Sequence, residues 1–325
     1  MERSFKSLKY ALLVVLLVVC NQGQSFADPI QPGNILISNH GGNNIQLLDP
    51  TTGTVTTLLS VSSTPIGLAF DGSNNLYINV DQGIQVYNPT TATLNTSFFT
   101  GIGQREGLAF DSVTQNLFSV SYGANRLEQV DLSGHLVRTI TIPGSQTLLG
   151  VTARGGKLIV TDLDNGNIYL ATTTNPTVFT TIGVASASST YGVDIDSSGD
   201  IFVNDFNGLM DKFHFNGSTW TKSIFINTLN TPANGLSIGD DGSFTISQFG
   251  ANTVSIFNSD GTLRHNYTGV DSPDELVVFA PIRSSGGGPS TSPVPEPGSI
   301  TLLASGLIGL GAMVRGKLRR IRPGA

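Results

Sequence analysis

The sequence predicts an all-β fold, a six-bladed β-propeller whose ring is closed by a C-terminal strand joining the N-terminal blade. Three observations carry this prediction. The central region is rich in Gly, Thr, Ser, Asn, Val and Ile, which is typical of short strands joined by tight turns. A short phrase recurs about every forty residues. The two ends of the repeat region are incomplete in complementary ways.

The recurring phrase starts with a glycine, which apolar residues follow. Its copies begin at Gly67, Gly107, Gly150, Gly192 and Gly235, and a degenerate copy begins at Glu275. The successive intervals are 40, 43, 42, 43 and 40 residues. A steady period in this range, with several short strands in each unit, is typical of a β-propeller.

Each repeat contains further runs in which apolar and polar residues alternate, as half-buried strands require. Second strands are expected at 76–80, 117–120, 158–161, 201–204 and 244–247. Third strands are expected at 84–87, 127–130, 168–170 and 254–257. Fourth strands, which are Thr-rich and more variable, are expected at 98–99, 137–142 and 178–182.

The ends of the repeat region determine the number of blades. Residues 34–61 supply only a second, third and fourth strand, and residues 275–281 supply only a first strand. Together they complete one blade, which makes six and removes the open edges of the ring. A seven-bladed ring or an open solenoid does not explain both incomplete ends. We therefore expect the propeller to occupy residues 28–283.

The N-terminus has the features of a cleavable secretion signal over residues 1–27. A basic start precedes an apolar stretch at 11–19, which is too short to span a bilayer. Small side chains at Ser25 and Ala27 predict cleavage after Ala27. An uncleaved anchor is the alternative, and Cys20 raises a lipoprotein alternative that lacks the small preceding residue it needs. After cleavage the chain has no cysteine, which excludes disulfides and zinc–thiolate sites.

The C-terminus carries a second targeting signal. A Gly/Ser/Pro linker at 284–293 precedes an apolar stretch at 300–314 and an Arg-rich end. The motif Pro295-Glu296-Pro297 stands between the linker and the apolar stretch. We expect a short transmembrane segment at 300–314 whose basic end stays cytoplasmic.

Over residues 294–322, the Pro-Glu-Pro motif, the apolar stretch and the basic end together resemble the PEP-CTERM sorting signal of Gram-negative bacteria. The resemblance implies processing by an exosortase near the motif, transient anchoring in the inner membrane, and a final place in the cell envelope or outside the cell. A plain tail anchor is the alternative. Exosortase substrates are commonly associated with exopolysaccharide, so extracellular polysaccharide or a surface protein is an implied partner.

The charge of the propeller limits its partners. Residues 28–295 contain 9 Lys and Arg against 21 Asp and Glu, a net charge of −12. This excess of acidic groups argues against nucleic acid or an anionic membrane surface as a partner. The units resemble NHL-type repeats, as in Gly199-Asp-Ile-Phe-Val-Asn-Asp205, but that resemblance implies a fold and no single function.

Residues that directly precede each recurring phrase should ring one mouth of the central channel, because first strands line the channel. Around the ring they are Ile66, Glu106, Leu149, Tyr191, Asn234 and Asp274. Three of the six carry oxygen donors, namely Glu106, Asn234 and Asp274. Carboxylate and amide oxygens are the ligands that Ca²⁺ and other hard cations prefer.

This trio resembles the metal ligands of the gluconolactonase and luciferin-regenerating family of six-bladed propellers. The matching phrases are Glu106-Gly107-Leu108, Asn234-Gly235-Leu236 and Pro273-Asp274. The resemblance implies a Ca²⁺, Zn²⁺ or other divalent cation held by the trio, with Asp274 as the catalytic base of a lactone hydrolase.

The chain also departs from that family. Ser189-Thr190-Tyr191 stands where substrate-binding Arg and Asn residues are usual, and Glu275 follows Asp274 in place of glycine. A structural alternative is that the polar residues serve turns and that Glu106 pairs with Arg105. His40, in a slot held by aromatic residues in other units, is interpreted as packing.

Two functions remain open. The first is an exported binding or scaffold propeller, extracellular or matrix-associated, and the lack of a full catalytic set favours it. The second is a metal-dependent, lactonase-type hydrolase.

Overall fold

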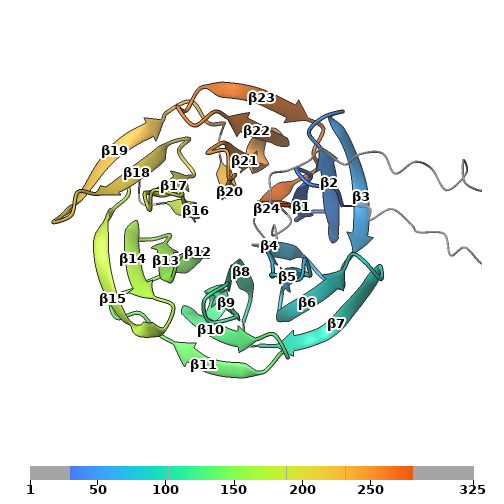
Figure 1. Ribbon diagram of the computed structural model, residues 1–325, viewed down its shortest axis with the longest axis horizontal. Helices are drawn as coiled ribbons and strands as arrows, with labels where there is room; N and C mark the ends of the chain where they lie inside the picture. The colour runs from blue at the N-terminus through green and yellow to red at the C-terminus, as the bar shows by residue number, and fades with distance from the viewer. Residues whose placement is uncertain (1–29, 102, 188, 231, 281–325) are drawn as a thin grey trace, which may run out of the picture. The chain divides into compact units, whose positions relative to one another are not determined.

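The computed structural model describes residues 30–101, 103–187, 189–230 and 232–280. Their 24 strands form six four-stranded antiparallel sheets, arranged as blades around a central axis (Figure 1). The predicted all-β, six-bladed propeller is confirmed. The predicted secretion signal, linker and sorting tail lie outside the described residues, and within those residues no helix could cross a membrane.

Each blade runs from an inner strand at the axis to an outer strand at the rim (Figure 1). The inner strands are β4 (Pro65–Phe70), β8 (Arg105–Asp111), β12 (Leu148–Arg154), β16 (Thr190–Ile195), β20 (Ala233–Ile238) and β24 (Pro273–Val278). The second strands are β1 (Ile35–Asn39), β5 (Leu76–Val80), β9 (Asn116–Ser121), β13 (Lys157–Asp162), β17 (Ile201–Asp205) and β21 (Phe244–Gln248). The third strands are β2 (Asn44–Asp49), β6 (Gly83–Asn88), β10 (Arg126–Asp131), β14 (Asn167–Thr172), β18 (Met210–Phe215) and β22 (Thr253–Phe257). The outer strands are β3 (Thr54–Ser60), β7 (Thr93–Thr100), β11 (Leu136–Ile140), β15 (Asn175–Val184), β19 (Trp220–Ile226) and β23 (Leu263–Thr268).

The ring closes as the incomplete ends predicted. Strand β24 pairs with β1 in a sheet of order β24-β1-β2-β3, with Leu276 opposite Ile37. Beyond the strand, Phe279 and Asn34 continue the pairing through a backbone hydrogen bond of 2.8 Å. Closure thus gives the N-terminal blade its inner strand, and each of the six described sheets has four strands.

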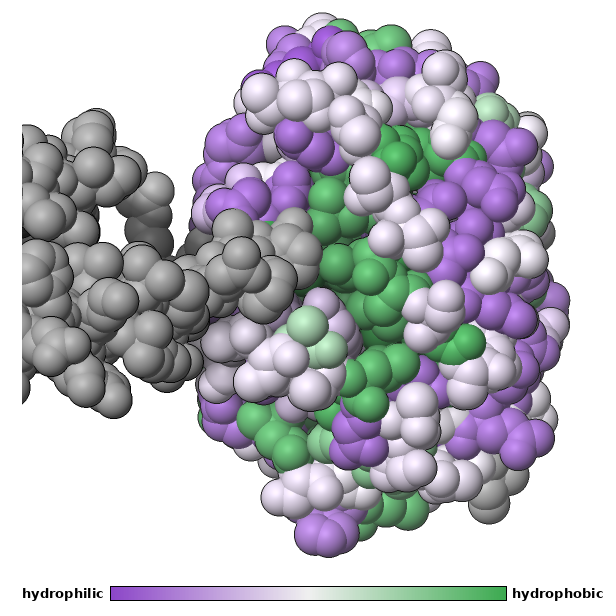
Figure 2. Space-filling model, turned by 90° about the vertical axis from the view of Figure 1, so that its right-hand side faces the viewer, coloured by the Kyte–Doolittle hydropathy of each residue, from purple (hydrophilic) through white to green (hydrophobic). Residues whose placement is uncertain are grey.

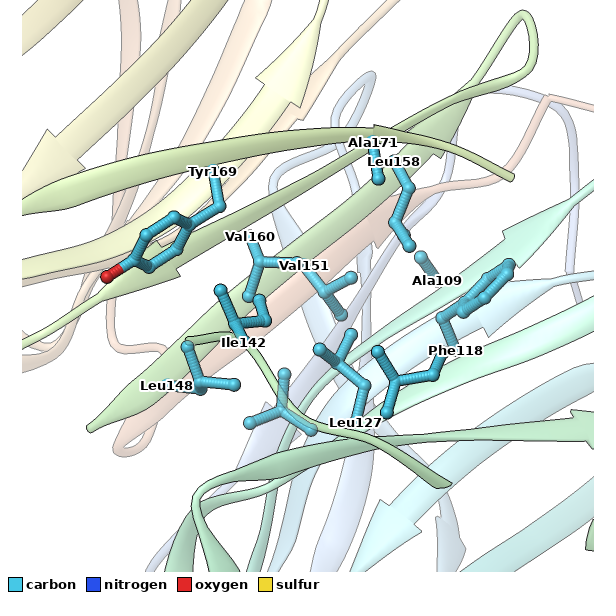
Figure 3. Packing of buried hydrophobic residues seen from close by; sticks show 12 residues of the cluster. Ala109, Phe118, Leu127, Ile142, Leu148, Val151, Leu158, Val160, Tyr169 and Ala171 are labelled. Carbon is cyan, nitrogen blue, oxygen red and sulfur yellow. The ribbon is translucent and has the colours of Figure 1, made fainter. Parts of the chain in front are cut away.

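Adjacent blades are held together by apolar side chains that fill the wedge between their sheets. Figure 3 shows one such cluster, in which Phe118 and Leu127 of one blade pack with Val151, Val160 and other residues of the next. Packing of this kind excludes water and fixes the position of each inner strand relative to its neighbour.

The rim is less apolar. Figure 2, which views the right-hand side of Figure 1, shows hydrophobic residues interspersed among hydrophilic ones. On this side β3 has no fully buried residue: Leu58 and Leu59 pack against the cluster that contains Leu36, and Val55 packs against the cluster that contains Ile37. The rim strand is therefore only partly buried.

The inner strands bulge at the recurring phrase, and the bulge explains its glycine. At Gly150 the ladder with β13 is interrupted, and the Gly150 N–H donates instead to Thr161 Oγ1 at 2.9 Å. Thr161 Oγ1 donates in turn to the Tyr191 carbonyl of the next blade, at 3.2 Å. A Cβ on Gly150 would lie 2.1 Å from that carbonyl oxygen, so a side chain would push the blades apart.

The same pair of hydrogen bonds, from a glycine N–H to a hydroxyl and from that hydroxyl to a carbonyl of the next blade, recurs in the blade before the closing strand. The Gly235 N–H donates to Ser247 Oγ at 2.7 Å, and that hydroxyl donates to the carbonyl of Asp274. Buried hydroxyls on second strands therefore fix the backbone of residues that line the channel mouth.

Candidate functional site

Four polar residues from inner strands meet at one mouth of the channel and form its floor. They are Glu106, Tyr191, Asn234 and Asp274. The Tyr191 hydroxyl lies 2.8 Å from Asp274 Oδ1 and 3.1 Å from Glu106 Oε2. Because a hydroxyl carries one proton, both contacts are satisfied together when Glu106 is protonated and donates to the Tyr191 oxygen. The structure thus brings the predicted trio together, with a tyrosine at its centre.

Asp274 accepts hydrogen bonds from several of the residues around the floor. Asn234 Nδ2 donates to Asp274 Oδ1 at 2.7 Å, and His40 Nδ1 lies 2.9 Å from Asp274 Oδ2. Both carboxylate oxygens of Asp274 are therefore engaged by protein groups. Asn234 Oδ1, by contrast, is buried and has no hydrogen-bond partner among the described residues.

Above the floor stands a second tier of side chains, which we call the collar. It consists of the residue that follows each second strand: His40, Asp81, Tyr122, Leu163, Phe206 and Phe249. Five of these six, all except Asp81, line a cavity of about 420 Å³ whose floor holds the four polar residues. A volume of this size is in the range of sites that bind small molecules.

Burial and crowding of acidic groups shift the ionisation of the floor. Burial, then the neighbouring charge of Asp274, raises the pKa of Glu106 to about 8. Burial also raises the pKa of Tyr191 well above its usual range, so its hydroxyl keeps its proton. The hydrogen bond to Asp274 raises the pKa of His40.

Deeper in the channel, Glu275 is a second buried carboxyl group. Burial, then the charge of Asp274, raises the pKa of Glu275 to about 8, although it accepts the N–H groups of Leu236 and Leu276. Glu275 occupies the glycine position of the recurring phrase in the closing strand, and its carboxylate lies against Gly235. Its side chain therefore joins the closing strand to β20.

The raised pKa values of Glu106 and Glu275 predict that the protein is most stable in mild acid. Glu106 and Glu275 bind protons more tightly in the folded chain than in the unfolded one. The stability that they contribute is therefore complete below about pH 4.5 and is lost as pH rises through about 8. We expect the free energy of unfolding, measured by urea titration, to fall between about pH 5 and pH 9.

Replacing Glu275 with glutamine should flatten that pH profile, because the neutral amide keeps an oxygen for the two N–H groups. Replacing Asp240, which is 87% exposed, with asparagine is the matched control and should leave the profile unchanged. A wild-type protein equally stable at both ends of the range would contradict the assignment of protonated carboxyl groups.

The divalent cation implied by the family resemblance does not fit this arrangement of side chains. An ion shared by Glu106 and Asp274 would need oxygen ligands at about 2.4 Å, where the Tyr191 hydroxyl already contacts both carboxylates. Asn234 presents its NH₂ group to Asp274, and this group is a donor. Among the described residues, no group of three or more His, Cys, Asp or Glu is arranged to hold a metal.

Two expectations about neighbouring residues were wrong. Glu106 does not pair with Arg105, which instead lies buried against Glu128 and Ser119. His40 is not mere packing, because its ring bonds Asp274 and lines the cavity. The signal that could have revealed the collar was present in the sequence, since His40 stands in the same slot as Tyr122, Phe206 and Phe249.

The comparisons with known proteins agree with this architecture. The family described as PEP-CTERM protein-sorting motif matches residues 293–320. No curated protein matches the chain. Among solved structures, a chain of a nidogen–laminin complex is similar with a TM-score of 0.66 and 16% identity, covering 75% of this chain and 97% of that one.

Two similar structures are enzymes. A streptogramin B lyase has a TM-score of 0.56 and 14% identity, covering 75% of this chain and 83% of its own. The virginiamycin B lyase from Staphylococcus aureus has a TM-score of 0.57 and 13% identity, covering 77% and 87%. At such identities these likenesses show the fold alone. The chain is thus a six-bladed β-propeller with a PEP-CTERM protein-sorting motif, which marks it as an exported protein of the cell envelope.

Proposed function

We propose that this protein is an exported binding propeller that takes its ligand at the channel mouth. The observation that carries the proposal is the cavity of about 420 Å³, in which a collar of mainly aromatic and apolar side chains surrounds a polar floor. Aromatic faces supply contact area and the floor supplies directional hydrogen bonds, the usual combination in small-molecule sites.

The state of Asp274 favours binding over hydrolysis. A general base needs a free carboxylate oxygen within reach of the water or hydroxyl that it deprotonates. Here Oδ1 accepts from Tyr191 and Asn234, and Oδ2 is engaged by His40. The carboxylate therefore organises the floor, and three protein groups already occupy its two oxygens.

The sorting tail indicates where binding takes place. A PEP-CTERM motif implies processing by an exosortase-type system, and we place the released or envelope-attached propeller in contact with extracellular polysaccharide or a surface protein. Aromatic side chains such as Tyr122, which is 37% exposed, suit contact with a sugar ring.

The alternative is a metal-dependent hydrolase of the lactonase type, with Glu106, Asn234 and Asp274 as ligands. Titration calorimetry of the purified protein with Ca²⁺ and with Zn²⁺ separates the two, together with an assay of gluconolactone hydrolysis. We expect that the wild-type protein binds neither ion at a site that the Asp274→Ala variant loses. We also expect no metal-dependent hydrolysis of the lactone. Binding lost in that variant together with lactone hydrolysis would overturn the proposal.

A further inference from the structure

We infer that the ligand of the channel mouth is an uncharged, hydroxyl-rich molecule of the neutral-sugar class, and that His40 Nε2 hydrogen-bonds one of its hydroxyls. The inference rests on the proposed binding function, and it names the class of the ligand and the residue that selects it. Three features of the mouth support it: the pairing of its charges, the fixed ring of His40 and the aromatic collar.

The charges of the cavity wall are already paired within the protein. Apart from tyrosines, the ionisable residues that line the cavity are His40, Glu106 and Asp274. Glu106 keeps its proton and shares it with the Tyr191 oxygen, and Asp274 pairs with His40 at 2.9 Å. Asp81 of the collar does not line the cavity, and water screens the charge of its partly exposed carboxylate. A charged ligand would therefore lose its water without gaining a free counter-charge, which is costly.

His40 offers the cavity a polar atom on a ring that is held in place. Its Nδ1 bonds Asp274, and the ring stands edge-on to Phe249, with centroids 5.9 Å apart and planes at 83°. Nδ1 is turned towards a carboxylate on a residue that is only 4% exposed, yet the side chain of His40 is 42% exposed and lines the cavity. The accessible edge of the ring is therefore the one that carries Nε2, an atom that no described residue hydrogen-bonds.

A hydroxyl is the group that suits this nitrogen best. When Nδ1 donates to Asp274, Nε2 is an acceptor on the neutral ring and a donor on the protonated ring. A hydroxyl both accepts and donates, so it satisfies Nε2 in either state. A carboxylate suits only the protonated ring, and an ammonium group suits only the neutral one.

The collar adds contact area that needs no charge on the ligand. Tyr122 is 37% exposed, and the half-buried Phe206 lies 5.5 Å from the Tyr191 ring, so aromatic surface stands directly above the floor. Leu163 and Pro232 extend the same wall with apolar groups. A sugar ring has C–H faces that pack on such surfaces and hydroxyls at its edge that reach polar atoms, so it matches both parts of the wall.

The test compares four β-1,4-linked tetramers, built from glucose, glucuronic acid, N-acetylglucosamine and glucosamine. Glucose and N-acetylglucosamine are uncharged, and each charged tetramer differs from its uncharged counterpart by one substituent on each ring. Titration calorimetry of the purified protein would be run at about pH 6, where carboxylates are ionised and amines are protonated. We expect each uncharged tetramer to bind about tenfold or more tighter than its charged counterpart. A charged tetramer that binds as tightly as its counterpart would overturn the inference.

Two substitutions at His40 separate a contact with the ligand from support of Asp274. His40→Asn can place an amide near the position of Nδ1 but has nothing at the position of Nε2, and it should weaken binding of the glucose tetramer about fivefold to tenfold. His40→Gln can place its amide near the position of Nε2 and should bind more tightly than His40→Asn. The reverse order would show that His40 acts only by holding Asp274, which contradicts the inferred contact. Asp240→Asn, in the turn between β20 and β21 at the other end of its blade, is the control and should bind like the wild type.

The inference and the proposed function fail in different ways. If none of the four tetramers bound, the inference would be wrong, but binding to native matrix that the collar variants lose would still support a binding propeller. If the protein bound neither the tetramers nor the matrix, both would be wrong.

Discussion

Replacing Arg105 with methionine is expected to lower the free energy of unfolding by about 3–5 kcal/mol, measured by urea titration. Arg105 is fully buried at the start of β8, where it pairs with Glu128 and donates to Ser119 Oγ at 2.9 Å. Its guanidinium also stands 5.2 Å from the ring centre of Phe99. Removing the cation leaves the 2%-exposed Glu128 side chain with only the partly exposed Arg126 as a charge partner.

A double variant distinguishes the loss of a charge partner from a loss of packing. Arg105→Met combined with Glu128→Leu removes both buried charges and should recover most of the lost stability. If the double variant were as unstable as the single one, the pair would matter through shape alone. A loss below about 1 kcal/mol for Arg105→Met would contradict the burial of the pair.

Ending the chain after Asp271 is expected to abolish the cooperatively folded monomer. The truncation removes β24, and with it the inner strand of the first blade and the floor residue Asp274. Strand β1 then presents an open edge, and the cluster that contains Ile37 and Leu276 loses one side. Light scattering should show aggregates, and thermal unfolding should lose its single sharp transition.

A chain that ends after Ile282 is the matched control, because it keeps β24 and the pairing of Phe279 with Asn34. It should remain a monomer with a sharp transition. A monomeric, cooperatively unfolding product from the shorter chain would show that the ring does not depend on its closing strand.

Most of the fold could be predicted because each blade repeats the same physical solution. The recurring glycine marks the bulge where neighbouring inner strands approach, and the complementary ends identify the closing sheet. Strand β18 (Met210–Phe215) was missed, because its Met-Asp-Lys-Phe run lacks the β-branched residues typical of strands. Asp162 and Asp205, the last residues of β13 and β17, accept backbone N–H groups of the turns that follow these strands.

The candidate site could be predicted in its members but not in its chemistry. Glu106, Asn234 and Asp274 were identified from equivalent positions in different blades. The role of Tyr191 depends on the width of the channel, which lets its hydroxyl reach an acid 85 positions earlier in the chain. The width of the channel results from the packing of all six blades, so no short stretch of sequence indicates it. Tyr191 was therefore left out of the predicted trio, although it stands at the centre of the floor.

The central claim, that the channel mouth is where the exported propeller binds, is tested most directly with the matrix itself. Co-sedimentation would compare the wild-type protein with the collar variants Tyr122→Ala and Phe249→Ala on extracellular polysaccharide prepared from the producing cells. Phe215→Ala, which alters a 45%-exposed aromatic residue away from the mouth, is the control. We predict that the wild-type and control proteins sediment with the matrix and that the collar variants stay in solution. Equal sedimentation of all four, or of none, would contradict the account.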